Sequence, residues 1–376
     1  MKIAFDLRRI GNPGIGRYMK CLSESITAQA PEHEYLLIMP PGGEGLVDAP
    51  NAEKIAPRLK YYSVREQIEL PRILIRHKID LLHSPHFLLP LVRPCPAVAT
   101  IHDVIYMACP RDLHSRAGRL YYRAMMKACS RLATRIVTDS EYSKREIVRH
   151  LRAAPAKIEV IYPGVDQGFR RVTDSVRIDA ARSKYGLDRD YILCVGIYKP
   201  RKNHAGLLRA FRCFRESGGE AQLVIAGPMA EGEHVLRRLA TELGIAEHVV
   251  FAGFVNEPDL PALYSAARVC VCPSFYEGFG FTVLEAMACG SPVVCSSATS
   301  LPEVAGAAAL YADPHAPEQM ATQILRAMSD EVLRTSLVQQ GRQNLQRFNW
   351  ADTARQTLAV YHHALQMPLP KQPTHE

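Results

Sequence analysis

The stretch RVCVCPSFYEGFGFTVLEAMACGSPVVCSS, residues 268–297, decides the fold. It begins and ends with short strand-like runs, and the segment between them carries helix stop signals, Gly290 followed by Pro292. A strand, a helix and a second strand in this order form the repeating unit of a parallel sheet. We therefore predict a helix from about Phe279 to Gly290 between two parallel strands.

The same alternation continues through the whole chain. Short apolar runs recur with helical segments between them: KIAFDL, EYLLIM, IDLLHS, AVATIHD, RIVTDS and KIEVIYPG, then YILCVG, QLVIAG, VVFAGF, ARVCVCPS, SPVVCSS and AALYAD. Polar residues dominate residues 165–190, where we place the boundary between two doubly wound α/β domains. The predicted domains span residues 1–170 and 185–349, and a last helix follows at about 350–366.

Length and composition agree with two globular domains. The chain has 376 residues, of which 47% are hydrophobic and 22% charged, so it is too long for one ordinary core. It contains neither a signal-peptide pattern nor 18 consecutive apolar residues, so we expect a cytoplasmic protein. The ten cysteines lie in apolar runs without a CxxC pair, and Cys270 and Cys272 lack further zinc ligands. We expect them to be reduced core residues.

The positive charge of the chain is concentrated in one segment. From Arg111 to Lys157 there are twelve Lys or Arg against four Asp or Glu, within a net charge of +8. Steps of three or four residues predict one helix with a cationic face and an apolar face. The cations are Arg116, Arg119, Arg123, Lys127, Arg131 and Arg135, and the apolar residues are Leu113, Leu120, Ala124, Ala128 and Leu132.

This cationic face has two interpretations. It is an ordinary solvated face, or it attracts anionic headgroups or a pyrophosphate-linked lipid acceptor at the inner face of a membrane. Nucleic acid is not expected as a partner, because no exposed aromatic residues alternate with the cations and no recognised binding motif accompanies them.

Two carboxylates flank the start of the helix predicted after Phe279. Glu285 falls on its apolar face, where a buried carboxylate costs several kcal/mol or so unless it is paired, for instance with ribose hydroxyls or a basic side chain. Gly278 and Gly280 leave backbone amides free at the helix N-terminus, whose partial positive charge suits a diphosphate. Glu277, in the turn before this helix, is placed to contact the group attached to the diphosphate.

Three cations follow the first strand of the second domain. Lys199, Arg201 and Lys202 lie in VGIYKPRKN, at the end of a strand where parallel sheets bind ligands. Cations there can neutralise a leaving diphosphate without a metal. The alternative interpretation is a solvated basic loop.

A glycine-rich turn follows the first strand of the first domain. In RRIGNPGIGRY, Gly14 and Gly16 loosen the turn, and Arg17 opens a helix. The turn could cradle a phosphate or let an acceptor approach. It contains neither a Walker loop nor a GxGxxG fingerprint, so it could equally be only a turn.

Together these segments resemble the large family of retaining GT-B glycosyltransferases, family 4, which includes mannosyltransferases and glycogen-synthase-like enzymes. EGFGFTVLEAMACGSPVV is similar to the E-x7-E signature of that family, PRKN to its basic donor-phosphate loop, and VVFAGFV lies between them in the family order. In the first half of the chain, the family pattern is matched by GIGRY, HSPHFLLP and ATIHDVIY. The resemblance implies two Rossmann-like domains facing across a cleft, with the C-terminal helix returning to the N-terminal domain.

The resemblance also implies roles for the donor site. Glu285 would hold the ribose hydroxyls, Glu277 would contact the donor sugar, and Arg201 with Lys202 would stabilise the diphosphate. The backbone around Phe251 to Phe254 would hold the base. The remaining residues of the implied donor site are Lys199, Gly278, Phe279, Gly280 and Phe281.

In the first domain the resemblance singles out His102, which matches a histidine near the reacting sugar carbon. The alternative is a core histidine satisfied by Asp103. Asp103 itself is assigned, with Gly14, Gly16 and Arg17, to the acceptor or phosphate site. One departure concerns Ile197, which stands where many members have an arginine. Either Arg201 or Lys199 would take over that role, or the donor phosphate would be held more loosely.

The function implied is a hexosyltransferase that needs no metal or cofactor and stabilises charge on the leaving diphosphate. The most similar patterns suggest mannose from GDP-mannose and a lipid-linked or oligosaccharide acceptor of surface polysaccharide synthesis. A UDP-sugar donor, a nucleotide-sugar epimerase and a membrane-associated scaffold without activity remain as alternatives. A nucleotide-dependent oxidoreductase would need a dinucleotide fingerprint that neither half has. The DxD pattern at Asp188–Asp190 is interpreted as accidental, because it precedes a strand in the linker.

Overall fold

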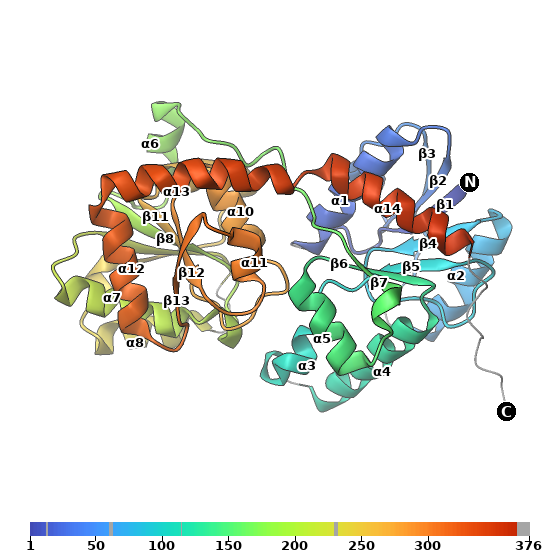
Figure 1. Cartoon of the computed structure of the whole chain (residues 1–376), viewed down its shortest axis with the longest axis horizontal. Helices are drawn as coiled ribbons and strands as arrows, with labels where there is room; N and C mark the ends of the chain where they lie inside the picture. The colour runs from blue at the N-terminus through green and yellow to red at the C-terminus, as the bar shows by residue number, and fades with distance from the viewer. Residues whose placement is uncertain (13, 60–62, 114, 229–231, 367–376) are drawn as a thin grey trace. The chain divides into compact units, whose positions relative to one another are not determined.

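The computed structural model divides the chain into two compact units (Figure 1). It describes residues 1–12, 14–59, 63–113, 115–228 and 232–366. Unit 1 is Met1–Gly164 together with the chain from Phe348 onward, and unit 2 is Val165–Arg347. Each unit is built around one parallel sheet, as the alternation of strands and helices predicts.

Unit 1 contains a seven-stranded sheet in its described residues, with the order β3-β2-β1-β4-β5-β6-β7. All neighbouring strands pair in parallel. The central strands read as continuous apolar runs because helices cover both faces of the sheet. The strands are β1 Lys2–Asp6, β2 Glu34–Ile38, β3 Ala52–Ile55, β4 Leu81–Ser84, β5 Ala97–Thr100, β6 Arg135–Thr138 and β7 Ile158–Val160.

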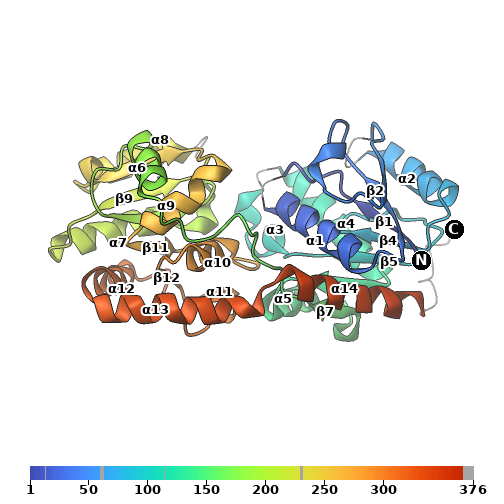
Figure 2. The same cartoon turned by 90° about the horizontal axis from the view of Figure 1, so that it is seen from above.

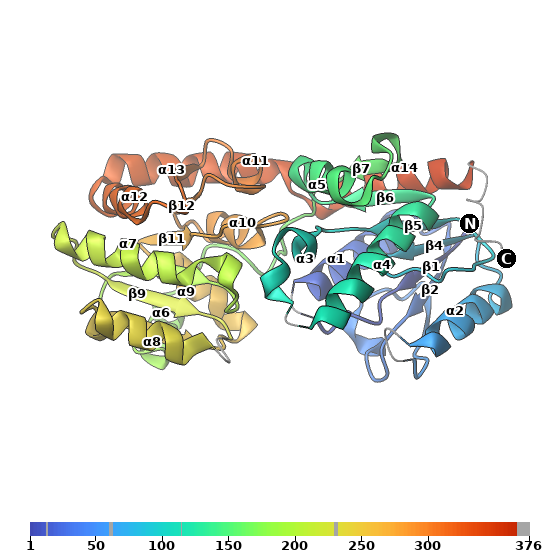
Figure 3. The ribbon, with the colours of Figure 1, turned by 90° about the horizontal axis from the view of Figure 1, so that it is seen from below.

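Two groups of helices cover this sheet on opposite faces. Helices α1 (Ile15–Gln29) and α14 (Trp350–Leu365) share one buried core with it. Helices α2 (Val64–Arg76), α4 (Arg116–Leu132) and α5 (Glu141–Leu151) share the other, and α4 lies across the sheet in Figure 3. A short helix, α3 (Ile105–Ala108), precedes α4.

In its described residues, unit 2 repeats the architecture with six parallel strands in the order β10-β9-β8-β11-β12-β13. Helices lie beside strands β9, β11 and β12 in Figure 2. The strands are β8 Tyr191–Val195, β9 Gln222–Ala226, β10 Val249–Gly253, β11 Val269–Cys272, β12 Val293–Ser296 and β13 Ala309–Ala312. The helices are α6 Ser175–Lys184, α7 His204–Glu216, α8 Glu233–Glu242, α9 Leu260–Ala266, α10 Phe281–Ala288, α11 Leu301–Ala305, α12 Pro317–Ser329 and α13 Glu331–Asn344.

The strand orders determine where each unit can bind a ligand. In both sheets the order reverses beside the first strand, between β1 and β4 in unit 1 and between β8 and β11 in unit 2. Open parallel sheets bind ligands at the carboxyl ends of the strands at such a switch point. The segments after β1 and β4, with those after the neighbouring β5 and β6, in unit 1 and after β8, β11 and β12 in unit 2 are therefore the ones to inspect.

The C-terminal helix α14 belongs to unit 1, so its predicted return to the N-terminal domain is confirmed. Thr353 donates to the carbonyl of Tyr162 at 2.7 Å, and Gln29 donates to the carbonyl of Ala351 at 3.0 Å. The chain passes so close at Gly164 that a Cβ there would lie 2.4 Å from the backbone nitrogen of Trp350. A glycine is required at that crossing.

The structure corrects three details of the sequence analysis. Strand β3 was not predicted, because its residues are only partly buried and form no apolar run. Helix α10 spans Phe281–Ala288, which is shorter than predicted, because Gly280 adopts φ 115° and serves as its N-cap. Helix α4 ends at Leu132, so Arg135 lies in β6, and Leu120 is 72% exposed although we placed it on the apolar face.

The apolar face of α4 shares only Leu132 with the predicted set. Its buried apolar side chains are Tyr122, Met126, Cys129 and Leu132. All ten cysteines of the chain are free thiols, as expected. Among the described residues, no helix combines the length and the hydropathy needed to cross a membrane.

Candidate functional site

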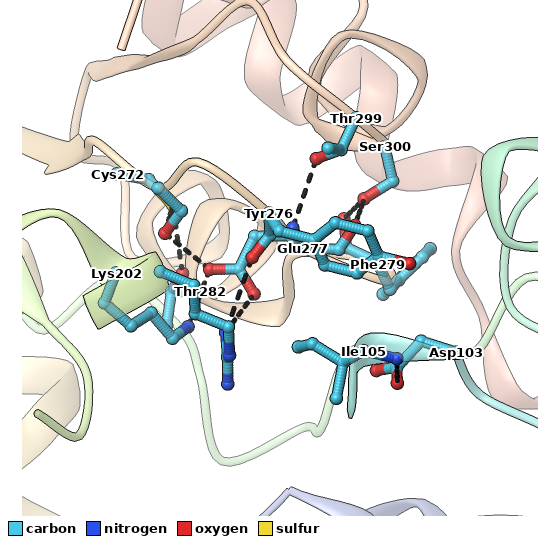
Figure 4. A network of polar contacts seen from close by, with 12 residues as sticks. Asp103, Ile105, Lys202, Cys272, Tyr276, Glu277, Phe279, Thr282, Thr299 and Ser300 are labelled. Carbon is cyan, nitrogen blue, oxygen red and sulfur yellow. Dashed lines mark hydrogen bonds and ion pairs between the residues drawn. The ribbon is translucent and has the colours of Figure 1, made fainter. Parts of the chain in front are cut away.

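Glu277 is the centre of the polar cluster at the switch point of unit 2 (Figure 4). It follows β11 and is 7% exposed. Its Oε1 accepts hydrogen bonds from Lys202 Nζ at 2.7 Å and from Ser274 Oγ at 2.6 Å, and Arg201 lies 3.5 Å from its Oε2. Burial alone would raise the pKa of Glu277, but the charges of Lys202 and Arg201 outweigh it and lower the pKa. Glu277 is therefore a buried carboxylate held in its charged form.

The turn that carries Glu277 is fixed by the segment after β12. The backbone N–H of Glu277 donates to Thr299 Oγ1 at 3.1 Å, and Ser300 Oγ donates to the carbonyls of Glu277 and Phe279 at 3.0 and 2.8 Å (Figure 4). These bonds hold the turn in place up to Gly280, where α10 begins. Sequence reasoning missed Ser274, Thr299 and Ser300, because hydroxyl residues in loops carry no pattern that separates such a role from an ordinary turn.

The predicted basic loop joins this cluster only in part. Arg201 and Lys202 lie in a short 3-10 helix after β8 and reach Glu277, whereas Lys199 precedes that helix and makes no described contact with Glu277. Asn203, in a left-handed conformation at φ 56°, caps α7 and donates to the carbonyls that follow β11 and β13, which anchors the loop. Ile197 is 40% exposed at the end of β8.

Glu285 lies on the buried face of α10 and is 6% exposed. Tyr264 of α9 donates a hydrogen bond to its Oε2 at 3.0 Å. Burial and the charge of Glu285 raise the pKa of Tyr264 well above its usual value, so the phenol stays protonated and remains a donor. The buried carboxylate thus has a partner, as the sequence required, and one such partner is the hydroxyl of Tyr264. The predicted contact of Glu285 with a ribose stays a prediction.

The aromatic residues predicted around the donor lie on two elements. Phe251 in β10 packs beneath the guanidinium of Arg237 at 4.7 Å, and Phe254, just beyond the strand, is 70% exposed. Phe279 is buried, and its ring meets that of Phe281 edge to face at 5.1 Å. Phe254 follows the edge strand of the sheet, two strands from β8, and its exposed ring is available to a ligand because it loses no packing on contact.

In unit 1, His102 follows β5 and faces two acceptors. Its Nδ1 lies 2.7 Å from Asp139 Oδ2, and its Nε2 lies 3.3 Å from the carbonyl oxygen of Pro85. The alternative that Asp103 satisfies His102 is wrong: Asp103 accepts instead from the backbone N–H of Ile105 at 2.9 Å, at the start of α3 (Figure 4). Burial alone would lower the pKa of His102, but the charge and hydrogen bond of Asp139 outweigh it and raise the pKa.

Backbone geometry explains two glycines of the glycine-rich turn. Gly14 caps α1 with φ 77°, a conformation that favours glycine. At Gly16 a Cβ would lie 1.9 Å from the carbonyl oxygen of Ile10, so only glycine fits. Arg17 lies in the first turn of α1 and is half-buried. The predicted contact of this turn with a phosphate or an acceptor stays a prediction.

The described residues contain no group of three or more His, Cys, Asp or Glu side chains arranged to hold a metal ion. Asp188 and Asp190 of the DxD pattern lie between α6 and β8, with side chains 71% and 58% exposed, and their neighbours are Arg189 and Arg268. The two carboxylates therefore lie apart from the cluster of Glu277.

The chain is similar to known proteins over both units. Residues 177–344 match the family described as glycosyl transferases group 1, and residues 14–169 match glycosyltransferase family 4. The O-antigen chain mannosyltransferase B of Escherichia coli is 35% identical over 288 residues, which cover 76% of this chain and 74% of that protein. A serotype-specific mannosyltransferase of Escherichia coli is 29% identical over 278 residues, 73% of this chain, but only 34% of its own length.

The fold also has solved counterparts. The Anabaena protein HepE, crystallised with UDP and glucose, superimposes with a TM-score of 0.75 at 22% identity, covering 96% of this chain and all of that one. At this identity the likeness concerns the fold. It spans both sheets and the C-terminal helix, so the two units described above are the two halves of a known architecture.

Proposed function

The chain belongs to the family of group 1 and family 4 glycosyltransferases, has the GT-B fold and is a hexosyltransferase; from that premise we propose that it transfers mannose from GDP-mannose with retention of configuration. The acceptor we propose is a lipid-linked saccharide or an oligosaccharide of surface polysaccharide synthesis. The support for mannose is the similarity to the O-antigen chain mannosyltransferase B of Escherichia coli, at 35% identity. A UDP-sugar is the second donor, favoured by the UDP bound to a protein of the same fold.

The observation that carries the proposal is the cluster of Glu277, Lys202 and Arg201 at the switch point of unit 2. When the bond between the sugar and the diphosphate breaks, negative charge grows on the phosphate and positive charge on the ring. The two cations can stabilise the negative charge, and the buried carboxylate beside them can stabilise the positive charge, without moving. Fixed charges of this kind make a large contribution to catalysis. We propose that these cations, rather than a bound metal, neutralise the leaving diphosphate.

A direct test separates the donors and the reaction type. Purified protein would be incubated in EDTA with GDP-mannose or UDP-glucose, with and without a saccharide acceptor, and the products followed by NMR. We expect release of GDP that depends on the acceptor and an α-linked product from the α-configured donor. Interconversion of the nucleotide sugar without acceptor would establish the epimerase alternative, and a requirement for divalent metal would overturn the metal-free proposal.

We also propose that unit 1 meets an anionic membrane through the side of the sheet covered by α2 and α4. Seven of the eight large exposed hydrophobic residues described in unit 1 lie on these helices or between β4 and β5, and none lies on α1 or α14. They are Val64, Ile68, Ile75, Leu91, Val92, Leu120 and Tyr121. Exposed cations of α4 lie among them: Arg116, Arg123, Lys127 and Arg131. Apolar side chains beside cations suit an interface of anionic lipid.

Vesicle sedimentation tests the membrane proposal. We expect the protein to sediment with phosphatidylglycerol vesicles but not with phosphatidylcholine alone, and the double variant Arg123→Glu, Lys127→Glu to lose at least tenfold in binding, because each cation near the surface contributes about 1 kcal/mol. The matched control reverses Arg209 and Arg212, two exposed cations of α7 in unit 2. Equal losses in both variants would contradict a specific surface.

A further inference from the structure

The two ring nitrogens of His102 both face groups that can only accept a hydrogen bond. A carbonyl oxygen has no proton, so Nε2 must carry one to bond Pro85 at 3.3 Å. A carboxylate has none either, so Nδ1 must carry one to bond Asp139 at 2.7 Å. Neutral imidazole has a single N–H and can satisfy only one of these two acceptors. The geometry therefore fits the cationic ring.

Asp139 also requires a positive partner. It is 2% exposed, and its Oδ1 has no hydrogen-bond partner among the described residues. A buried carboxylate with one unsatisfied oxygen is costly unless an opposite charge compensates it. Among the described residues, its other oxygen, Oδ2, is bonded by His102. The pair is thus best balanced as imidazolium and carboxylate.

The groups that surround His102 leave Asp139 as its main charged neighbour. The ring of Tyr18 in α1 meets the imidazole edge to face at 4.7 Å, and burial keeps that phenol protonated by raising its pKa. Burial lowers the pKa of His83, in β4, to about 3, so His83 is neutral between Tyr361 and Thr100. The other titratable groups facing His102 are Asp103, beside it in sequence, and the buried, neutral His86 after β4.

We propose that His102 acts in its cationic form, as a hydrogen-bond donor and a fixed positive charge, and that Asp139 is the positioning residue that keeps it so. The inference rests on the proposed transferase function for its role in the reaction. The long bond from Nε2 to Pro85 is the one that a ligand oxygen can replace, because the short bond to Asp139 holds the ring in place. His102 is then a donor toward the substrate and cannot act as a general base.

The transfer step balances without a base at His102. The bond between the sugar carbon and the diphosphate oxygen breaks, and a bond from that carbon to the acceptor oxygen forms. The hydroxyl proton of the acceptor passes to the departing diphosphate oxygen, because cationic His102 has no lone pair to receive it. His102 keeps both of its protons throughout.

The charge of His102 can be measured without any activity. In protein labelled with 15N-histidine, long-range proton–nitrogen spectra distinguish imidazolium from either neutral tautomer, and His102→Gln identifies the signal. We expect imidazolium at pH 7.5 in the wild type and a neutral ring in Asp139→Asn. The control is Glu159→Gln, an exposed carboxylate of unit 1 paired with Arg135 at 3.7 Å, which leaves the ring charged. A neutral His102 in the wild type would overturn the proposal.

Kinetics then test the role in the reaction. We expect Asp139→Asn to lower kcat by about 100-fold, as for the loss of one preorganised charged donor, with the KM of the donor changed less than threefold. Asp139→Glu should recover part of the rate, because it restores the charge. The wild-type kcat should fall as the pH rises through the raised pKa of His102; a kcat that rises over that range would identify a base and refute the assignment. Absence of transfer with any nucleotide sugar, alongside a cationic His102, would refute the proposed function and leave the charge state standing.

Discussion

Both units place a carboxylate and a cation at the carboxyl edge of a parallel sheet, but the two pairs differ in which member can lose its charge as the pH changes. In unit 2 the buried Glu277 has two permanent cations, Arg201 and Lys202, and its pKa is lowered. In unit 1 the cation is His102, whose pKa is raised by Asp139. Lysine and arginine keep their charge at any physiological pH, whereas histidine does not.

The charges of the two units therefore respond to pH in different ranges. The lowered pKa of Glu277 keeps its carboxylate charged down to mildly acidic pH, so this cluster suits a task that needs constant charge, such as binding a diphosphate. The pair of unit 1 loses its cation as the pH rises. Any pH dependence of the rate near neutrality should therefore originate in unit 1.

The largest expected effect comes from removing the carboxylate of unit 2. Glu277→Gln leaves Lys202 and Arg201 half-buried without their counter-charge, so we expect kcat to fall by about 100-fold or more. We also expect unit 2 to lose about 3 kcal/mol of stability, as for a broken buried pair. Turnover and thermal unfolding would be measured together with Glu233→Gln, which breaks only the exposed pair with Arg237. Normal turnover in Glu277→Gln would show that the reaction does not need the carboxylate of unit 2.

The two cations of unit 2 should not be equivalent. Lys202 bonds Glu277 at 2.7 Å, whereas Arg201 lies 3.5 Å from it. We expect Lys202→Met to lower kcat by about 100-fold and Arg201→Met by about tenfold, since both remove charge but only one removes the short bond. Steady-state rates with GDP-mannose would be compared. An equal or reversed order would mean that the distance to Glu277 does not reflect the contact with the diphosphate.

A smaller effect is expected for the second glutamate. Glu285→Gln keeps the shape of the side chain and an oxygen for Tyr264, but it weakens hydrogen bonds to bound hydroxyls. Charged hydrogen bonds contribute about 1.5 kcal/mol or more, so we expect the KM of the donor to rise about tenfold while kcat changes little. Donor titrations of both glutamate variants would show the contrast. A loss confined to kcat would place Glu285 with Glu277 in the chemical step.

The sequence predicted the fold well because both units consist of buried parallel strands, whose apolar runs stand out. The strand that it did not reveal, β3, lies at an edge of its sheet and is half-exposed. The error in α4 has the same cause. Leu120 and Cys129 could each have faced inward, and only the packing against the sheet decides that Cys129 is buried and Leu120 is exposed.

Some contacts of the site could be predicted from the sequence and others could not, for a physical reason. Glu277 lies in the loop after β11, and Arg201 and Lys202 lie in the loop after β8, so all three follow strands that meet at the switch point. The family resemblance assigns them to one donor site. The partner of His102 could not be found in that way. Asp139 lies 37 residues away after a different strand, and the only partner that the sequence offered, as an alternative, was the adjacent Asp103, which accepts instead from the backbone N–H of Ile105. Contacts between different loops depend on register, which patterns do not specify.

The smallest expected effect is the change with pH of the stability that each pair contributes, and it tests the comparison most directly. The pKa of Glu277 is lowered on folding, so its pair stabilises unit 2 above the ordinary pKa of about 4.5 and is lost as the pH falls through the lowered value. The pKa of His102 is raised, so its pair stabilises unit 1 fully below about 6.5 and is lost as the pH rises through the raised value. The two units therefore lose their pairs at opposite ends of the pH scale.

Unfolding temperatures of the wild type, Glu277→Gln and Asp139→Asn between pH 3 and pH 9 would show this opposition. We expect the difference between the wild type and Glu277→Gln to shrink only in acid, and the difference between the wild type and Asp139→Asn to shrink only in alkali, each by about 2 °C or more. The two units should be monitored separately by hydrogen exchange, because a two-domain chain need not unfold in one step. If both differences shrank at the same end, the two pairs would share one titrating group, and the assignment of pH dependence to unit 1 would fail.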